Sequence, residues 1–327
     1  MSIIVVNWNG EQLIDECLKA LFCQTYPHYE VIFVDNGSAD FSVSRVRQHF
    51  PQAKVVELST NTGFSGGNQA GARIARGEFL ALVNNDARPD KAWLQNLLKP
   101  MLEDERVGFC SSKIVIEATA KINSAGGAIT SSGVGYDRGL GEATGQYNHS
   151  EFVFGACAAA ALYRRKMLDE IGFLDEDFFL YCEDVDLSFR AQLAGWKCVY
   201  VPTAIVSHKW QATAGRLSDL HVYYHNRNLE FVWIKNMPAK LMLRYAHHKI
   251  GQELMDIFGY CIRRGKWRPF LRAKLDAIRM VPIMLKKRAA IQRTKKVSDD
   301  YIASLLTPIF SETFRKHKRL ARLVSAF

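Results

Sequence analysis

The sequence has no long apolar run, no closely paired cysteines and no basic leader. The longest apolar stretch, residues 152–163, falls well short of the roughly 18 residues that a membrane-spanning helix requires. Residues 3–6 already resemble a strand with no basic segment before them, so we expect no signal peptide. Seven cysteines without a C-x-x-C pair, most in apolar surroundings, favour reduced core thiols in a cytosolic protein over a disulfide framework.

Two nucleotide-binding fingerprints are also missing. Gly63, Gly66 and Gly67 lie in a glycine-rich turn before a predicted helix, but their spacing fits neither the G-x-G-x-x-G motif nor a P-loop. This turn is either a phosphate cradle at a helix start or a simple tight turn. The missing fingerprint disfavours a nucleotide-dependent oxidoreductase. The lack of zinc-knuckle, RRM-like and helix-turn-helix sequences likewise disfavours a nucleic-acid-binding module.

The net charge of +10 is unevenly distributed along the chain. From Lys235 onward there are 22 Lys and Arg against 6 Asp and Glu, whereas the preceding residues carry 21 against 27. A slightly acidic body with a strongly basic tail usually contacts a polyanion, either nucleic acid or an anionic membrane. Basic clusters alternate in the tail with apolar segments such as residues 281–285, as in helices that lie on a membrane, where each basic residue contributes about 1 kcal/mol. A solvated helical appendage and a contact in a homo-oligomer are the alternatives.

Strand-like and helix-like segments alternate through the first two hundred residues. Strands are predicted at residues 2–6, 30–34, 54–58 and 79–83. This alternation predicts an α/β fold, a mainly parallel mixed sheet covered by helices on both faces. We expect this domain to span residues 1–217, followed by a helical, basic region over residues 218–327. Residues 124–147, rich in glycine and serine, are expected to form a long surface loop that acts as a lid.

Polar residues follow several of the predicted strands. Asp35 closes the second strand, residues 84–86 (Asn-Asn-Asp) close the fourth, and His208 follows a later apolar strand. The carboxylates of residues 183–186 open a helix behind the aromatic residues 178–181, which should desolvate them and raise their basicity. In an open α/β sheet such ends converge on one crevice, where ligands bind. Ordinary turn, capping and surface roles are the alternatives for each of these residues.

The combination of these groups indicates a chemistry. Carboxylate plus imidazole suits a divalent metal, Mn²⁺ at least as readily as Mg²⁺, and a spare carboxylate suits a general base. A divalent ion neutralises a leaving diphosphate, and a positioned base takes a proton from an attacking hydroxyl. The residues therefore predict metal-assisted group transfer.

Five motifs occur in order within residues 1–230. They are residues 5–9 (VVNWN), 34–38 (VDNGS), 61–68 (NTGFSGGN), 84–86 (NND) and 179–187 (FLYCEDVDL). Together they resemble the inverting nucleotide-sugar glycosyltransferases of family 2, which have the GT-A fold. The chain is similar to the bacterial rhamnosyltransferase branch, which shares the run at residues 224–228 (YHNRN). The Q-x-x-R-W signature of processive polymerases is absent, which indicates that one or a few sugars are added per encounter.

The resemblance implies roles for individual residues. Asp184 and its neighbour Glu183 match the family's catalytic pair, in which the aspartate is the general base. Asp86 and His208 match metal ligands, whereas Asn84 stands where the family often has a first acid. Nucleotide contacts are expected from Asn7, Trp8, Asp35, Gly63, Asn68 and Asn85. Contacts to the acceptor, or its orientation, are expected from Cys157, Asp186, Arg190 and Arg227.

The expected reaction follows from the resemblance together with the chemistry. One base without an enzyme nucleophile means inversion at the anomeric carbon. The first candidate is rhamnose, moved from dTDP-rhamnose to a cell-surface glycan or a lipid-linked acceptor; a UDP-hexose or UDP-N-acetylhexosamine is the alternative donor. We expect a cytoplasmic protein, peripheral on the inner face of the cytoplasmic membrane, that binds an anionic membrane and no nucleic acid. A polyanion-binding module that uses the basic tail is the alternative of another class.

Overall fold

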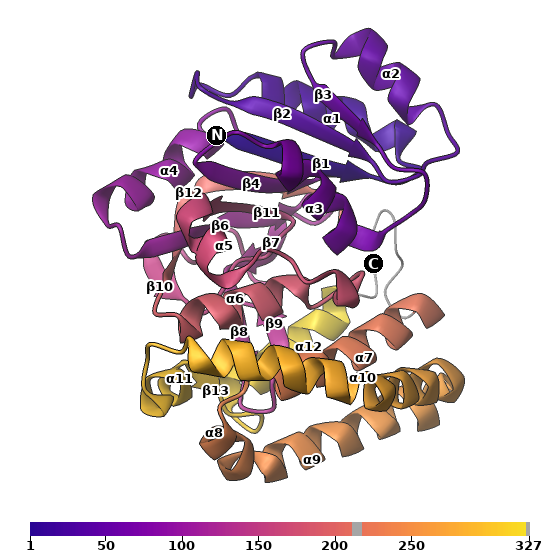
Figure 1. Ribbon diagram of the computed structural model, residues 1–327, viewed down its shortest axis with the longest axis vertical. Helices are drawn as coiled ribbons and strands as arrows, with labels where there is room; N and C mark the ends of the chain where they lie inside the picture. Colours follow the sequence, from indigo (N-terminus) through magenta and orange to yellow (C-terminus); the bar gives the residue numbers. More distant parts are fainter. Residues whose placement is uncertain (211–217, 325–327) are drawn as a thin grey trace.

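The computed structural model describes residues 1–210 and 218–324, and these fold into two sheets with helices packed around them (Figure 1). The expected domain boundary falls at residue 217, which lies outside the described residues. The larger sheet has the strand order β10-β12-β6-β11-β4-β1-β2-β3, with β5 paired to β12 and β7 to β6. Its strands are β1 (Ser2–Asn7), β2 (Glu30–Asp35), β3 (Lys54–Glu57), β4 (Phe79–Asn84), β5 (Ala87–Pro89), β6 (Val107–Ile116), β7 (Lys121–Ala125), β10 (Glu151–Val153), β11 (Ala160–Arg164) and β12 (Lys197–His208).

The larger sheet is mixed, and parallel pairs form its centre. β1 lies parallel between β2 and β4, and β3 extends the parallel row beyond β2. β11 is inserted antiparallel between β4 and β6, after which β6 and β12 are again parallel. The four strands predicted from apolar runs are β1 to β4. The predicted α/β fold with a mainly parallel mixed sheet is confirmed.

Alternation along the strands supplies a core on each side of the sheet. On β1, Ile3 and Val5 face one core and Ile4 faces the other, because successive strand side chains point to opposite faces. The first core is covered by α1 (Glu11–Phe22), α2 (Ser42–His49) and α4 (Trp93–Glu103). The second core is covered by α3 (Gly63–Ile74), α5 (Arg165–Ile171) and α6 (Glu183–Leu193).

The C-terminal helices form a further layer against the outer side of α6 (Figure 1). They are α7 (Asp219–Asn236), α8 (Ala239–Arg244), α9 (Ala246–Asp256), the π-helical turn η2 (Ile257–Ile262), α10 (Trp267–Arg293), α11 (Asp299–Leu305) and α12 (Glu312–Val324). Phe189 of α6, Phe231 of α7 and Met284 of α10 meet in one buried apolar cluster. Within the described ranges, no helix combines the length and apolar character needed to cross a bilayer.

Residues 124–147 do not form the surface loop that their glycine and serine content predicted. They contain β8 (Gly127–Thr130) and β9 (Gly135–Asp137), which make a second sheet with β13 (Leu306–Thr307). Small residues let this sheet approach α6: a Cβ on Gly135 would lie 2.3 Å from the Val185 side chain. The prediction of a lid was wrong, because here glycine serves close packing and not mobility.

A network of buried ion pairs joins α6 to the C-terminal helices. The fully buried Asp186 carboxylate of α6 accepts hydrogen bonds from Arg190 and from Lys235 of α7, each at 2.8 Å. Asn236 donates a third bond at 2.8 Å, and Lys235 also pairs with Asp175 at 2.5 Å. Burial alone would raise the pKa of the Asp186 carboxyl, but Lys235 and Arg190 hold it well below its usual value.

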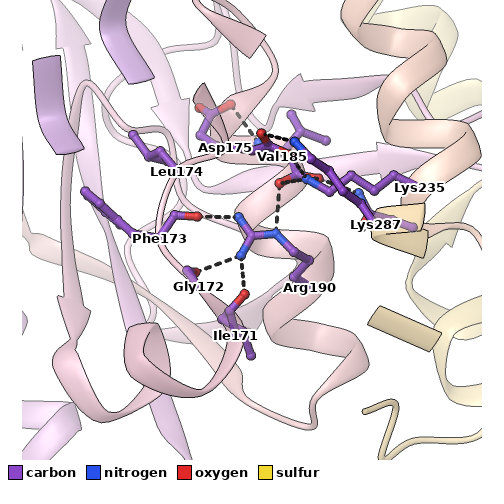
Figure 2. Close-up of polar contacts among 12 residues, drawn as sticks. Ile171, Gly172, Phe173, Leu174, Asp175, Val185, Arg190, Lys235 and Lys287 are labelled. Atoms are coloured by element: carbon purple, nitrogen blue, oxygen red, sulfur yellow. Dashed lines mark hydrogen bonds and ion pairs between the residues drawn. The ribbon is translucent and has the colours of Figure 1, made fainter. Parts of the chain in front are cut away.

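The same network fixes the segment that precedes α6. Figure 2 shows the Arg190 guanidinium donating to the carbonyl oxygens of residues 171–173, each at 2.7 Å. Lys287 of α10 reaches Asp175 at 2.5 Å and Asp177 of the short helix η1 (Glu176–Phe178) at 2.6 Å. The first part of the segment between α5 and α6 is therefore held by charged groups of α6 and α10.

We predict that Asp186→Ala destabilises the fold by about 3–5 kcal/mol, because it leaves Lys235 and Arg190 buried without their shared carboxylate. Chemical denaturation followed by circular dichroism measures the loss. The matched control is Lys296→Ala, whose ion pair with Glu170 is largely exposed and should cost less than about 1 kcal/mol. Equal stability of Asp186→Ala and the unmodified protein would contradict the role assigned to the network.

Candidate active site

The polar residues predicted at strand ends lie along one edge of the larger sheet. Asn7 and Asp35 are direct partners at the last register position of β1 and β2. Asn84 ends β4, the strand on the other side of β1, and His208 ends β12 opposite Ala87. The carboxyl ends of these strands thus lie along one edge of the sheet, which we call the crevice because an open α/β sheet is expected to bind ligands there.

Asp35 and Asn7 line the β1–β2 end of this crevice. Asp35 is buried; its Oδ2 accepts the Ser38 N–H at 3.0 Å, whereas its Oδ1 has no hydrogen-bond partner among the described residues. A buried carboxylate oxygen without a donor is costly unless a ligand supplies one. Asn7 Oδ1 accepts from Asn85 Nδ2 at 2.8 Å, which ties the ends of β1 and β4 together. Beside them, Trp8 is 43% exposed and presents a free aromatic surface.

The glycine-rich segment is the first turn of α3 and not a separate turn before it. Gly63 has φ +74°, and a Cβ there would lie 2.3 Å from the Phe179 carbonyl oxygen. The Ser65 N–H donates to that carbonyl at 3.2 Å. Phe179 thus occupies part of the N-terminus of α3, so the geometry favours a packing role for Gly63 over an open phosphate cradle. Asn68 is buried and bonds back to the Phe64 carbonyl at 2.9 Å.

Asp86 and His208 face each other in the middle of the crevice, and both are buried. His208 Nε2 lies 3.0 Å from Asp86 Oδ1, while His208 Nδ1 lies 2.8 Å from the Oδ1 of Asn123 on β7. Because an amide oxygen only accepts, Nδ1 carries the proton toward Asn123 and the Nε2 lone pair of the neutral ring points at the carboxylate. Two acceptors at that distance need a shared cation, either a proton or a metal ion.

The pair fits a divalent ion whose other ligands come from a bound molecule. Two neighbouring ligands about 2.1 Å from one octahedral ion are about 3.0 Å apart, which is the separation seen here. Asn123 supplies the outer hydrogen bond that orients a metal-binding histidine. Within residues 1–210 and 218–324, no three or more His, Cys, Asp or Glu side chains are grouped to hold a metal by themselves.

Asp184 begins α6 and borders the crevice. Its Oδ1 accepts from the Val185 N–H at 2.8 Å and its Oδ2 from the Ala158 N–H at 3.2 Å. The side chain is only partly exposed, and burial raises the pKa of its carboxyl. Glu183 is buried, and its Oε2 has no hydrogen-bond partner in the described part of the chain; burial and the neighbouring Asp184 raise the pKa of Glu183 well above its usual range. The environment thus favours Asp184 as the carboxylate that works at the surface of the crevice.

Sequence reasoning missed Asp137, which lies in the segment expected to be a lid. It ends β9 and is partly exposed at the floor of the recess. Burial raises the pKa of its carboxyl to about 6, and the neighbouring Asp184 carboxylate also raises it. The one available signal is that Asp137 is the only acid between Glu117 and Glu142.

The remaining predicted residues lie around the site rather than along the strand ends. Cys157 is beside Asp137 and Asp184, and burial raises the pKa of its thiol well above the usual value. Asp186 and Arg190 are buried in the ion-pair network, so they orient α6 and do not face the crevice. Arg227 donates to the carbonyl oxygens of Asp177 and Phe178, and so holds the loop that covers α3.

Comparisons with known proteins identify the family and the fold of this chain. A model of the family described as glycosyl transferase family 2 matches residues 2–172, more than half of the chain. The N-acetylglucosaminyl-diphospho-decaprenol L-rhamnosyltransferase of Mycobacterium tuberculosis is 25% identical over 256 residues, which cover 70% of this chain and 82% of that protein.

Solved structures show the same fold at low identity. GalNAc-T7 with UDP, GalNAc and Mn²⁺ superposes with a TM-score of 0.60 at 16% identity, covering 75% of this chain and 49% of the other. TarS of S. aureus has a TM-score of 0.54 at 17% identity, covering 90% of this chain and 55% of the other. The architecture is therefore the GT-A fold, with the additional helices after residue 218.

Proposed function

Because this chain belongs to glycosyl transferase family 2, we propose that it transfers a sugar from a nucleotide sugar to a hydroxyl acceptor with inversion at the anomeric carbon. The observation that carries the proposal is the convergence of the buried Asp86–His208 pair and the partly exposed Asp184 at one sheet edge. Asp137 lies within electrostatic reach of both Asp184 and His208, which supports a single site.

The proposed donor is dTDP-rhamnose and the proposed acceptor is a lipid-linked or cell-surface glycan. Support comes from the mycobacterial L-rhamnosyltransferase, of which the match covers 82%, and whose name specifies a diphospho-decaprenol acceptor. A UDP-hexose or UDP-N-acetylhexosamine is the alternative donor, supported by the similarity in fold to GalNAc-T7 with UDP. In either case Asp35 Oδ1, which has no partner among the described residues, can accept a hydrogen bond from the base or from a sugar hydroxyl of the nucleoside.

Asp184 is the proposed general base. Its carboxylate takes the proton of the acceptor hydroxyl as that oxygen attacks the anomeric carbon from the side opposite the diphosphate. The bond from the anomeric carbon to the diphosphate breaks in the same step, and the nucleoside diphosphate leaves. The raised pKa of the Asp184 carboxyl makes it a stronger base than an ordinary aspartate. Because this single displacement forms no covalent bond to the enzyme, the product has the inverted configuration.

Asp86 and His208 are the proposed metal ligands, and Asp35 with Asn7, Asn85 and Trp8 the proposed nucleoside contacts. A divalent ion, Mn²⁺ or Mg²⁺, would neutralise charge on the leaving diphosphate. Asn123 keeps the His208 ring in the tautomer that presents Nε2 to the crevice. Gly63 and Asn68 act indirectly in this proposal, by letting α3 and the Phe179 loop close around the site.

The proposed location is the inner face of the cytoplasmic membrane, where a lipid-linked acceptor is found. The alternative of a polyanion-binding module is weaker, because the family match covers residues 2–172, which lie in the acidic part of the chain that carries the candidate site. Some cations of the basic tail are also paired inside the fold. Lys287 binds Asp175 and Asp177, Lys295 binds Asp299, and Lys316 binds Glu142. These charges hold the C-terminal layer in place, whereas other basic residues of the tail stay exposed.

Donor binding tests the proposed function directly. Titration calorimetry with dTDP-rhamnose, UDP-glucose and UDP-N-acetylglucosamine, each with and without Mn²⁺, should give metal-dependent binding of one donor, with slow hydrolysis of that donor to the nucleoside diphosphate. Asp86→Ala should lose the metal-dependent part, and His208→Ala should lose less, because the carboxylate supplies the charge. If none of the three nucleotide sugars is bound or hydrolysed, the proposal is overturned. Metal-dependent binding that is unchanged in both variants would exclude Asp86 and His208 as the metal ligands.

We predict that Asp184→Asn lowers kcat by about 10²–10⁴-fold, the usual contribution of a positioned base. Donor affinity should stay near that of the unmodified enzyme, because the amide keeps the size of the side chain. Steady-state kinetics on the identified donor give kcat, and calorimetry gives the affinity. Asp169→Asn, at an exposed position on α5, is the matched control and should leave both unchanged. A kcat of Asp184→Asn close to that of the unmodified enzyme would exclude Asp184 as the base.

The raised carboxyl pKa values predict the acidic limb of the pH profile. A base works only when deprotonated, so kcat/KM should fall as pH drops through the raised pKa of Asp184, above the usual aspartate range. The Asp184 carboxylate is one of the causes that raise the pKa of Asp137 to about 6, so Asp137 is protonated before Asp184 as the pH drops. Asp137→Asn should therefore leave this limb in place. The profile of kcat/KM against pH measures both. A limb that moves in Asp137→Asn would contradict this order of protonation.

A further inference from the structure

The outer surface of α9, η2 and α10 exposes many large apolar side chains. We call this surface the docking face and define it by Ile250, Leu254 and Phe258 with Leu271, Leu275 and Ile278, all between 50% and 67% exposed. Contiguous exposed apolar surface of this kind marks a contact with another molecule or with a membrane.

The apolar residues of α10 form one stripe beside its buried side. Leu271, Leu275 and Ile278 follow the spacing of four and three residues that places side chains on one helix face. Phe270 and Ala277 face the packed side of the same helix and are almost completely buried. The stripe is therefore distinct from the face of α10 that is buried against α7.

The stripes of α9 and α10 border the same seam. Lys274 of α10 binds Glu253 of α9 at 2.6 Å. Leu271 lies three residues before Lys274 and Ile250 three residues before Glu253, so each is one helical turn from the ion pair. The two apolar stripes thus flank one inter-helix contact and form one surface, at the end of the molecule remote from α2 and β3 (Figure 1).

Positive charge runs along the docking face. Residues 239–293 contain 14 Lys and Arg against three Asp and Glu. Two of the three acids are neutralised by neighbouring cations, Glu253 by Lys249 and Lys274, and Asp276 by Arg279. Arg268, Arg272, Arg279 and Lys286 of α10 are exposed, and each directly follows an exposed apolar residue, namely Trp267, Leu271, Ile278 and Leu285.

We propose that the docking face lies flat on an anionic phospholipid bilayer. A helix surface with an apolar stripe and a parallel basic row suits the headgroup boundary, where apolar side chains enter the acyl region and cations meet lipid phosphates. A two-fold contact with a second copy would instead bring the basic rows of both chains together, which opposes association. The inference rests on the proposed function, in which the acceptor is lipid-linked.

One end of the docking face adjoins the crevice. Arg268 and Arg272 line a groove of about 430 Å³ together with Tyr224 of α7. The Tyr224 ring stacks on Phe179 at 4.9 Å, and the Phe179 carbonyl accepts the Ser65 N–H at the start of α3. A bilayer under this face would therefore present a lipid headgroup beside the nucleotide-binding edge of the sheet.

Vesicle binding by the full chain tests the proposal. The probes are vesicles of phosphatidylcholine alone and mixed with phosphatidylglycerol, sedimented at low and high salt. The unmodified protein should bind the anionic vesicles, and less at high salt. Leu271→Glu with Leu275→Glu should weaken this binding at least tenfold. Arg268→Gln with Arg279→Gln and Lys286→Gln should weaken it about fivefold per residue.

The controls are on α4, which packs on the opposite layer. Leu102→Glu and Lys99→Gln replace exposed residues of the same types and should leave vesicle binding unchanged. If the two glutamate substitutions on α10 leave vesicle binding intact, or only convert a dimer to a monomer in light scattering, the proposal is overturned. Donor hydrolysis by the unmodified protein is measured in parallel without vesicles. If no hydrolysis is seen, the proposed function is refuted. Hydrolysis without vesicle binding would refute only the docking face.

Discussion

The buried carboxylate of Asp186 sets the position of the helix that carries the proposed base. Inside the protein an unpaired charge is costly, so Asp186 must keep both Lys235 and Arg190 as partners. That requirement fixes the rotation of α6 about its axis. Residues two apart on a helix point in nearly opposite directions, so holding Asp186 against α7 turns Asp184 toward the sheet edge. The C-terminal layer is thus part of the active site's support, although none of its helices carries the base or the proposed metal ligands.

Asp184 and Asp186 are half a helical turn apart in α6, but their carboxyl pKa values shift in opposite directions. Cations on both sides keep the pKa of Asp186 well below its ordinary value, whereas burial raises the pKa of Asp184. Residue type does not distinguish the two; only their surroundings do. Arg190, which also binds the carbonyl oxygens of residues 171–173, is one of the cations around Asp186. The backbone N–H of Ala158 donates to Asp184.

The second sheet connects the catalytic edge to the outer helices. β9 brings Asp137 beside Cys157 and Asp184, while β8 pairs with β13 from the C-terminal layer. The close approach of β9 to α6 depends on Gly135, which has no Cβ to strike Val185. The same outer layer then exposes the apolar and basic side of α9 and α10. The C-terminal helices therefore have two roles. Their inner side packs against α6, and their outer side is exposed to a partner.

By itself the sequence determined the α/β sheet, the strand ends and the polar residues on them, because strand period and buried apolar runs are local properties. Asp35, Asp86 and His208 were singled out as candidates this way, and Asp184 as one of the carboxylates that open a predicted helix; the tertiary structure brings Asp86 and His208 to 3.0 Å. Only the tertiary structure decided the rest. Asp137 and residues 124–147 read as a mobile loop because local sequence does not distinguish glycine used for packing from glycine used for flexibility. The sequence likewise left the roles of Asp186 and of the basic tail undecided. What a charged side chain does depends on its ion-pair partners, and these partners lie on helices up to about a hundred residues away in the chain.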